Sequence, residues 1–501
     1  MKKRFISLFL LTALLLGTIG CDSQSDTNDD TTADTTPSVS DTEPVEVEEL
    51  DFTEARKAVK DGLDEYENKF EGKEYRVAVS EANHKYVIVE DTSDVVDKAV
   101  YDRNMAVEER FGCKIVLAHT SERWSTAEGY IRTSVMSQED LFDIASHHAV
   151  SLGNLVLQDY FMNWYDIPAV DFTKPWWSDS TVDTLTYDNT CLVAVGDFAL
   201  TALSNAYCVY YNKADAEVYK LPDLYEVVNE GKWTIDYMLE LTKDIYEDSN
   251  RNDTVDNEDY FGYISDAGTN IVAYLWAFDN QILDVSGDNI ELVYKTEKIN
   301  DIVTKLVDAT SSGAIRIDSK YISSNGTKHN YGIELFAKGQ ALFSNGYITQ
   351  ALTFLRDMED DYGILPYPKW DEEQDEYLTM SDGNHTALAV PRTVPDENLE
   401  FVGVITEALC AESYKTLLPA YYEEALKLKG TRDDESLAMI DNITRSVVYD
   451  MGYIHNGASV ANILENLVIQ GNPNFESYWA SMSSKINEYY NGVIAYYQNY
   501  N

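Results

Sequence analysis

Beyond residue 50, the chain alternates between segments with helical spacing of apolar residues and short, continuous apolar segments. Apolar side chains three or four positions apart run from Phe52 to Phe70, which predicts an amphipathic helix. A short buried strand is predicted at 75–79, followed by the polar loop 80–84. Helical spacing returns at 97–111 and stops at Gly112, because glycine readily adopts the left-handed conformation that ends a helix.

Further strands are predicted at 113–118 and 141–145, and the second of these leads directly to His147 and His148. Thr234 is expected to cap a helix that continues to about Tyr246, since its hydroxyl can accept from a free amide of the first turn. Strands that alternate with helices predict an α/β fold with mostly parallel strands. In such sheets, ligands bind at the carboxyl ends of the strands.

The first twenty-one residues have the pattern of an export signal. Residues 1–4 are basic, residues 5–16 are mostly apolar, and small residues precede Cys21. The segment before Cys21 resembles a bacterial lipobox, which implies a lipoprotein signal peptide at 1–20 and lipidation of Cys21. We therefore expect a protein anchored by lipid on the extracellular face of the cell membrane. Ordinary cleavage that leaves a free thiol is the alternative.

Residues 21–50 are rich in Asp, Glu, Ser and Thr, and no Lys or Arg follows the signal segment before Arg56. Such a sequence buries too little apolar surface to offset the entropy of ordering, and its like charges extend it. We expect an acidic, disordered tether.

Composition restricts the class of the remaining chain of about 450 residues, which is long enough for two lobes. The net charge of −49 argues against nucleic acid as a partner, because the long-range field repels polyanions. The 36 Tyr and 8 Trp suit sugar rings, although core packing must use most of them. No C-x-x-C motif occurs; Cys191 and Cys208 either pair or remain buried free thiols.

The segment 248–259 has the spacing of an EF-hand-like calcium loop. The expected calcium ligands are Asp248, Asn250, Asn252, the carbonyl of Thr254, Asp256 and Asp259. Asp253 stands at loop position 6, where glycine is usual, and Asp259 replaces the usual Glu at position 12. We expect a structural Ca2+ and no catalytic cofactor; an acidic, solvated surface loop is the alternative.

Several stretches, taken in order, resemble extracellular solute-binding protein family 1, the sugar-type ABC transporter substrate-binding lipoproteins of Firmicutes. The matching stretches are 77–83, 103–115 (RNMAVEERFGCKI), 141–145, 209–213 (VYYNK), 224–233 (LYEVVNEGKW), 336–343 (FAKGQALF), 362–368 (YGILPYP) and 413–429.

The resemblance implies an α/β, two-lobed fold of the periplasmic-binding-protein type II, with a hinge and a helical C-terminal region. It implies the first part of lobe 1 at 51–195, lobe 2 at 196–380, and a return through the hinge with C-terminal helices on both lobes at 381–501. A monomer would capture a carbohydrate between the lobes and deliver it to the permease subunits of an ABC transporter.

The resemblance also places the ligand contacts by position. The expected ligand-binding residues are Glu81, Asn83, His147, His148, Asp197, Trp276, Asn345, Tyr347, Asp382 and Asn384, with His84 and the pair Trp176–Trp177 as weaker candidates. Tyr347 is expected to stack on sugar, and Trp276 belongs either to the core or to a stacking surface. A metal role for His147 and His148 is disfavoured, because neighbouring side chains of a strand point to opposite faces.

Three other functions compete with transport. A surface glycan-binding lipoprotein and a sensory lipoprotein need the same kind of cleft without a permease. A glycoside hydrolase needs two carboxylates across the scissile bond, but 87 acidic residues make some such pair inevitable. No G-x-S-x-G, H-E-x-x-H or Walker motif occurs, so we do not expect an enzyme.

Overall fold

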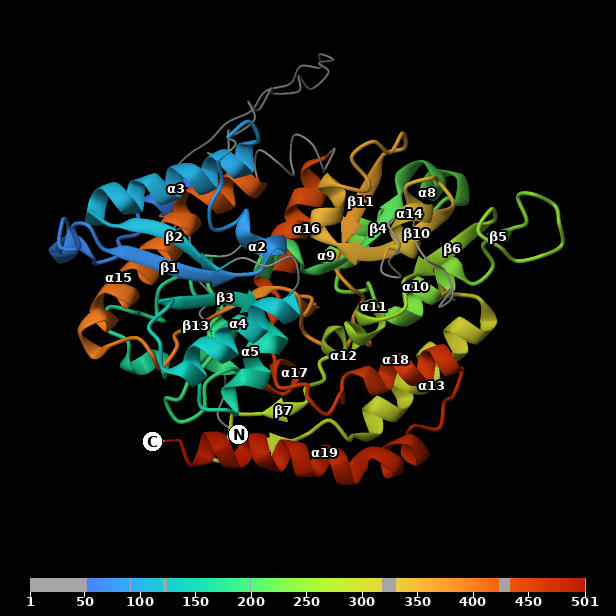
Figure 1. Cartoon of the computed structure of the whole chain (residues 1–501). Helices are drawn as coiled ribbons and strands as arrows, with labels where there is room; N and C mark the ends of the chain where they lie inside the picture. The colour runs from blue at the N-terminus through green and yellow to red at the C-terminus, as the bar shows by residue number, and fades with distance from the viewer. Residues whose placement is uncertain are drawn as a thin grey trace, which may run out of the picture. The chain divides into compact units, whose positions relative to one another are not determined.

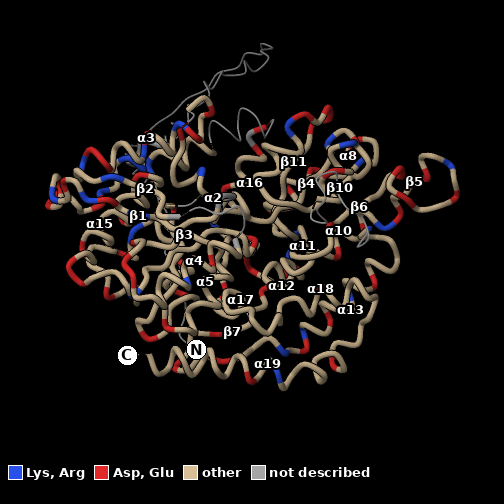
Figure 2. Tube along the Cα trace, viewed as in Figure 1, with Lys and Arg blue, Asp and Glu red and all other residues tan. Residues whose placement is uncertain are grey.

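The computed structural model describes residues 52–90, 92–119, 124–198, 200–317, 330–422 and 433–500. The predicted signal peptide, the tether and Cys21 lie outside the described residues. Residues 51–501 form a single structural unit. In it, two separate β-sheets are surrounded by helices (Figure 1). Asp and Glu are spread over the whole described chain rather than gathered on one element (Figure 2).

The first sheet has four strands in the order β13–β3–β1–β2. Its strands are β1 (Glu74–Val79), β2 (Lys114–His119), β3 (Ile144–His148) and β13 (Thr386–Ala389). β1 is parallel to β2 and to β3, whereas β13 returns from far along the chain and is antiparallel to β3. The parallel strands and their connecting helices agree with the α/β prediction.

The second sheet has six strands, in the order β11–β4–β10–β6–β5, with β9 also paired to β6. Its strands are β4 (Tyr207–Asn212), β5 (Tyr246–Glu247), β6 (Tyr260–Ser265), β9 (Arg316–Ile317), β10 (Ala341–Tyr347) and β11 (Tyr362–Leu365). β10 is parallel to β6 but antiparallel to β4, and both β11 and β5 pair antiparallel with their neighbours. The second sheet is therefore mixed rather than mostly parallel. Two small ladders complete the strands: β7 (Leu283–Asp284) with β8 (Glu291–Leu292), and β12 (Thr379–Met380) with β14 (Val447–Val448).

The chain crosses between the sheets after β3 and returns to the first sheet before β13. The two crossing segments lie side by side: Ala206 bridges to Ser381, and the backbone N–H of Asp382 donates to the carbonyl of Asn205 at 3.0 Å. Loop residues of such connections can absorb the φ/ψ changes of a hinge between lobes.

Helices cover both sheets and the space between them (Figure 1). The helices of the first half are α1 (Phe52–Lys57), η1 (Asp64–Tyr66), α2 (Glu81–His84), α3 (Val95–Phe111), α4 (Trp124–Ser137), α5 (Ala149–Val156), η2 (Trp164–Asp166), α6 (Asp179–Asp183), α7 (Thr201–Ser204), α8 (Lys213–Tyr219), α9 (Leu224–Asn229) and α10 (Ile235–Thr242). Those of the second half are α11 (Thr269–Val272), α12 (Tyr274–Ala277), α13 (Glu297–Ser312), α14 (Tyr331–Phe336), η3 (Ile348–Leu352), α15 (Asp396–Glu412), the π-helical η4 (Ser413–Leu417), α16 (Asp434–Arg445), α17 (Met451–Ile454), α18 (Asn462–Gln470) and α19 (Phe475–Gln498).

The C-terminal helix α19 contacts two segments that are far apart in the sequence, one near α13 and one near α5. Near its start, Trp479 stacks on Tyr294, which precedes α13, with ring centroids 5.8 Å apart. Near its end, the hydroxyl of Tyr496 donates to Asp159, which follows α5, at 3.1 Å. The helix therefore runs along both halves of the molecule, as Figure 1 shows.

Three sequence predictions of secondary structure differ from the observed elements. The single helix expected from Phe52 to Phe70 is wrong: α1 ends at Lys57, and Gly62, with a left-handed φ of 82°, lies between it and the short helix η1. The strand expected at 141–145 begins later, so His147 and His148 lie on β3 and not in the loop after it. The helix capped by Thr234 ends at Thr242, four residues early, since the following segment joins the sheet edge as β5.

Candidate functional site

The two sheets present their strand ends to one region. The carboxyl ends of β3, β6 and β10 are His148, Ser265 and Tyr347, and the antiparallel strand β4 begins beside them at Tyr207. The segment that leads into β13, which starts with Asp382, crosses at the same place. Carboxyl ends of strands are where α/β proteins place their ligands.

A polar cluster connects these strand ends. It consists of Tyr207, Thr269, Tyr347, Asp382 and Asn384, and we call it the Asp382 cluster. The Tyr207 hydroxyl lies 3.0 Å from Asp382 Oδ2, 3.3 Å from the Tyr347 hydroxyl and 2.5 Å from Thr269 Oγ1. The other carboxylate oxygen of Asp382 accepts from the backbone N–H of Asn384 at 3.0 Å and from its side-chain amide.

Burial affects the pKa of the two phenols of this cluster. Tyr207 and Asp382 are almost fully buried, Tyr347 and Thr269 are half-buried, and Asn384 is exposed. Burial raises the pKa of the Tyr207 and Tyr347 phenols, and the nearby Asp382 carboxylate raises it further. Both phenols therefore keep their protons at neutral pH. The cluster presents neutral hydroxyl groups next to a carboxylate and an exposed amide, a set that can both donate and accept hydrogen bonds.

His148 and Asn83 border the cluster from the first sheet. Burial lowers the pKa of His148, while the charge of Asp382 and a hydrogen bond with Asn384 oppose this shift. Its Nδ1 accepts from the backbone N–H of Ser151 at 3.2 Å, which fixes the ring at the start of α5. The amide of Asn83 donates at 3.1 Å to the hydroxyl of Thr386, the first residue of β13.

Three other residues expected at the ligand are buried apart from the cluster. His147 is fully buried opposite Ala387 of β13, and Asn345 is fully buried with its amide donating to Tyr367 at 2.8 Å. The indole N–H of the buried Trp276 donates to Asp450 at 3.1 Å. The side chain of Glu81 is outside the description, and His84 is half-buried on α2.

Asp197 lies on the crossing segment after β3 without a direct contact to the Asp382 cluster. Its backbone N–H donates to the carbonyl of Trp176 at 2.9 Å. Burial raises the pKa of its carboxyl to about 8, and the charge of Arg56 opposes this rise. Trp176 and its neighbour Trp177 are buried, and their indole N–H groups both donate to Glu407 at 2.8 Å. These tryptophans therefore serve lobe packing.

Tyr207 and Thr269 are members of the cluster that the sequence did not indicate. Tyr207 precedes the matching stretch at 209–213 by two residues, and Thr269 follows a strand that the sequence pattern did not reveal. Locating β6 in advance would have drawn attention to the polar residues after it.

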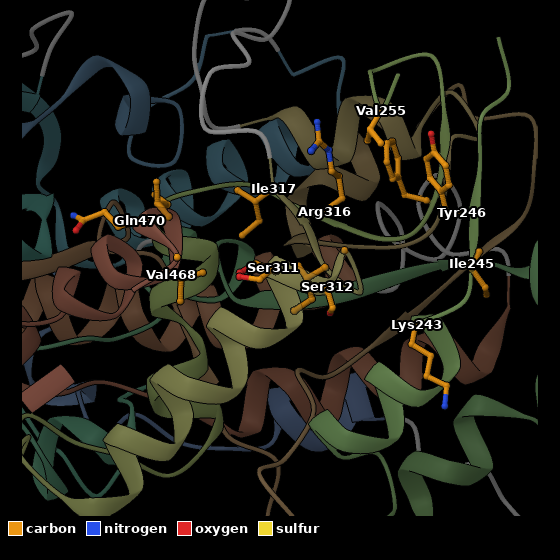
Figure 3. Close-up of a pocket in the computed structure, with 16 residues that line it drawn as sticks. Lys243, Ile245, Tyr246, Val255, Ser311, Ser312, Arg316, Ile317, Val468 and Gln470 are labelled. Carbon is orange, nitrogen blue, oxygen red and sulfur yellow. The ribbon is translucent and has the colours of Figure 1, made fainter. Parts of the chain in front are cut away.

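Four cavities of about 470 to 850 Å3 lie elsewhere. One, of about 670 Å3, lies between β5, β9 and the ends of α13 and α18 (Figure 3). No residue of the Asp382 cluster lines any of the four. We favour the cluster as the ligand site because its polar groups converge from several strand ends.

In the described part of the chain, neither the cysteines nor the residue types that bind metals form a further site. Cys113, Cys191, Cys208 and Cys410 are free and buried, so the structure gives no support to pairing of Cys191 with Cys208. Within the described ranges, no three His, Cys, Asp or Glu side chains lie close enough together to hold an ion by themselves. Among the same residues, no helix has the length and apolar character that crossing a bilayer requires.

Comparison with known proteins identifies the fold. No family model and no curated protein match the chain. An ABC transporter solute-binding protein from Thermotoga lettingae TMO, bound to alpha-D-tagatose, is 12% identical; the alignment covers 83% of this chain and 100% of that one, with a TM-score of 0.51. The chain has the two-lobed solute-binding fold.

Two further solved structures share the solute-binding fold over a similar length. An ABC transporter solute-binding protein from Agrobacterium radiobacter K84, in complex with ribitol, is 11% identical, with 84% of this chain and 98% of that one covered and a TM-score of 0.52. The maltose/maltodextrin-binding domain MalE from Bdellovibrio bacteriovorus, bound to maltotriose, is 12% identical, with 83% and 100% covered and a TM-score of 0.51. At these identities the likeness concerns the solute-binding fold alone, and it agrees with the two-lobed type II fold expected from the sequence.

Proposed function

We propose that this protein is a lipid-anchored, monomeric solute-binding protein on the extracellular face of the cell membrane. It captures a mono- or oligosaccharide between the two lobes and delivers it to the permease subunits of an ABC transporter. The observation that carries the proposal is the Asp382 cluster, where hydroxyl, carboxylate and amide groups gather at the strand ends of both sheets. The sugars and the sugar alcohol bound by the three compared proteins support the same ligand class.

The chemistry of the cluster favours a neutral ligand rich in hydroxyl groups. Asp382 accepts hydrogen bonds, the phenols of Tyr207 and Tyr347 donate or accept, and Tyr347 is only partly buried, so part of this aromatic residue is available to a ligand. The net charge of −49 disfavours an anionic ligand. A ligand that contacts both lobes stabilises the closed form, and the closed form is what a permease recognises.

A thermal-shift screen against monosaccharides, oligosaccharides, sugar alcohols and short peptides tests this proposal. A sugar should raise the melting temperature increasingly with its concentration, by an amount equivalent to about 2.7 kcal/mol at one hundred times its Kd. In Tyr347→Ala this rise should disappear, while in Tyr101→Ala it should persist, since Tyr101 is an exposed tyrosine of α3 outside the cluster. Stabilisation by peptides and by no sugar would overturn the ligand class.

A further inference from the structure

The loop between β5 and β6 projects away from the second sheet (Figure 1). It comprises residues 248–259 and contains five acidic side chains and one Arg. Such a concentration of like charge is unfavourable unless the charges are solvated or neutralised. The loop lies outside the Asp382 cluster, so the sugar-binding proposal does not explain it.

The backbone of the loop wraps around the carboxylate of Asp248. Asp248 Oδ1 accepts from the backbone N–H of Asn252 at 3.1 Å, and Oδ2 accepts from that of Asp253 at 2.8 Å. Asp253 has a left-handed φ of 56°, the conformation that usually requires glycine at this loop position. The loop therefore has the turn expected of the calcium-loop spacing, although this turn alone does not establish a site.

Asp259 provides an indication of a cation site that is independent of the loop's spacing and turn. Its side chain is fully buried, and its Oδ2 accepts from the backbone N–H of Asp256 at 2.8 Å and from the Tyr246 hydroxyl at 3.0 Å. Its Oδ1 is also buried and has no hydrogen-bond donor in the described structure. The bond from Asp256 ties this carboxylate to the backbone of the loop, and the hydroxyl of Tyr246 ties it to β5. A buried carboxylate oxygen without a partner is unfavourable, and a cation would satisfy it.

We propose that the loop binds one calcium ion, which fixes the β5–β6 connection to the edge of the second sheet. The ligands are side-chain oxygens of Asp248, Asn250, Asn252, Asp256 and Asp259, with the carbonyl of Thr254. The amides of Asn250 and Asn252 now donate to Asp256 at 3.2 and 2.7 Å. Because the carboxylates are not gathered tightly enough to hold an ion alone, the ion draws them together, and each amide rotates to present its oxygen.

The choice of calcium over magnesium follows from the donor set. Six or more protein oxygens on a loop that can adjust suit the variable coordination of Ca2+ at 2.3–2.6 Å. Magnesium requires a smaller, near-octahedral arrangement and usually retains several waters.

Terbium luminescence tests the site directly, because Tb3+ occupies calcium sites and is excited through a nearby tyrosine. Tyr246 donates to Asp259, so Tb3+ added to the whole chain should give sensitised emission that Ca2+ displaces with one ion per chain. Tyr246→Phe should lose most of the emission while the stabilisation by Ca2+ remains. Emission that Ca2+ does not displace would overturn the proposal.

Thermal unfolding with Ca2+, Mg2+ and chelator supplies the second measurement. Saturating Ca2+ should raise the melting temperature over the chelated protein by about 3–8 °C, more than Mg2+ does. Asp248→Asn, a partly exposed position, should lose this rise. Asp244→Asn, an exposed carboxylate just before β5, should keep it, and Asp253→Gly should bind Ca2+ more tightly. Equal shifts with Mg2+, or a full shift in Asp248→Asn, would overturn the calcium assignment.

Discussion

The side chain of Arg103 joins three segments that are far apart in the sequence, and we predict that Arg103→Met strongly destabilises the fold. Arg103, on α3, is fully buried. Its guanidinium donates to the carbonyls of Tyr86 at 3.0 Å and Phe198 at 3.0 Å, and to the Ser413 hydroxyl at 3.2 Å. These partners belong to the segment after α2, to the crossing segment after β3, and to η4.

The size of the effect follows from what the substitution leaves behind. Met fills a similar volume, but the carbonyls of Tyr86 and Phe198 lose a buried donor, and each loss costs about 1–3 kcal/mol. The carbonyl of Val87 keeps a donor, the amide of Asn104, at 2.6 Å. The desolvation that lowers the pKa of Arg103 to about 10 is relieved in the variant and offsets part of the loss. We expect a net destabilisation of about 3 kcal/mol.

Equilibrium urea unfolding followed by tryptophan fluorescence measures this difference in the free energy of unfolding. The m value, which is the slope of that free energy against urea concentration, should be the same in both proteins. Arg132→Met is the matched control. Arg132 is partly exposed and bonds to Glu128 and Gln158, so its loss should cost less than about 1 kcal/mol. A loss below about 1 kcal/mol in Arg103→Met would show that desolvation of the guanidinium cancels its hydrogen bonds, and our reasoning would be wrong.

Three further predictions concern stability. Burial raises the pKa of Glu407 to about 7, so the folded state holds its proton more tightly than the unfolded chain does. The free energy of unfolding should therefore fall by about 3 kcal/mol as the pH rises from 4.5 to about 7.5. In urea unfolding at a series of pH values, Glu407→Gln should show a weaker dependence on pH. A methyl group added at Gly403 would lie 1.8 Å from a backbone carbonyl, so Gly403→Ala should lower the melting temperature markedly, whereas Gly129→Ala, in open space on α4, should raise it slightly. The hydroxyl of Tyr75 lies 2.6 Å from that of Thr406, so Tyr75→Phe should lower the free energy of unfolding by about 1–2 kcal/mol. The buried Tyr294 hydroxyl has no partner among the described residues, so Tyr294→Phe should be neutral or stabilising. A larger loss of stability in Tyr294→Phe than in Tyr75→Phe would contradict the argument.

Elements that depend on neighbours in the sequence were predicted well. The strand at 75–79 is observed as β1, the helix that stops at Gly112 is observed as α3 with Gly112 at φ 76°, and Thr234 accepts from the backbone N–H of Tyr237 as a cap. Each of these features is decided within a few residues, by apolar spacing, by the freedom of glycine or by one capping hydroxyl. The same local rules overestimated the first helix, because Gly62 interrupts it and Asp61 is drawn to Arg110 at 2.7 Å.

The candidate site could be predicted only in part. The resemblance placed Tyr347 and Asp382 among the expected ligand contacts, and the structure brings both to Tyr207. The resemblance gave no means of separating His148, which borders the cluster, from His147, which is buried in the sheet. That difference depends on where β3 begins and on which face of the sheet each side chain lies.

The sequence by itself determined the α/β character, the main strands of the first sheet and the calcium-type spacing of 248–259, because these rest on periodicity and on residue types at short range. Only the tertiary structure decided that Tyr207 lies 3.0 Å from Asp382 across 175 positions, and that Arg103 connects three distant segments. Such contacts depend on how whole sheets and crossing segments pack, and no local pattern encodes the partner of a hydrogen bond at that separation.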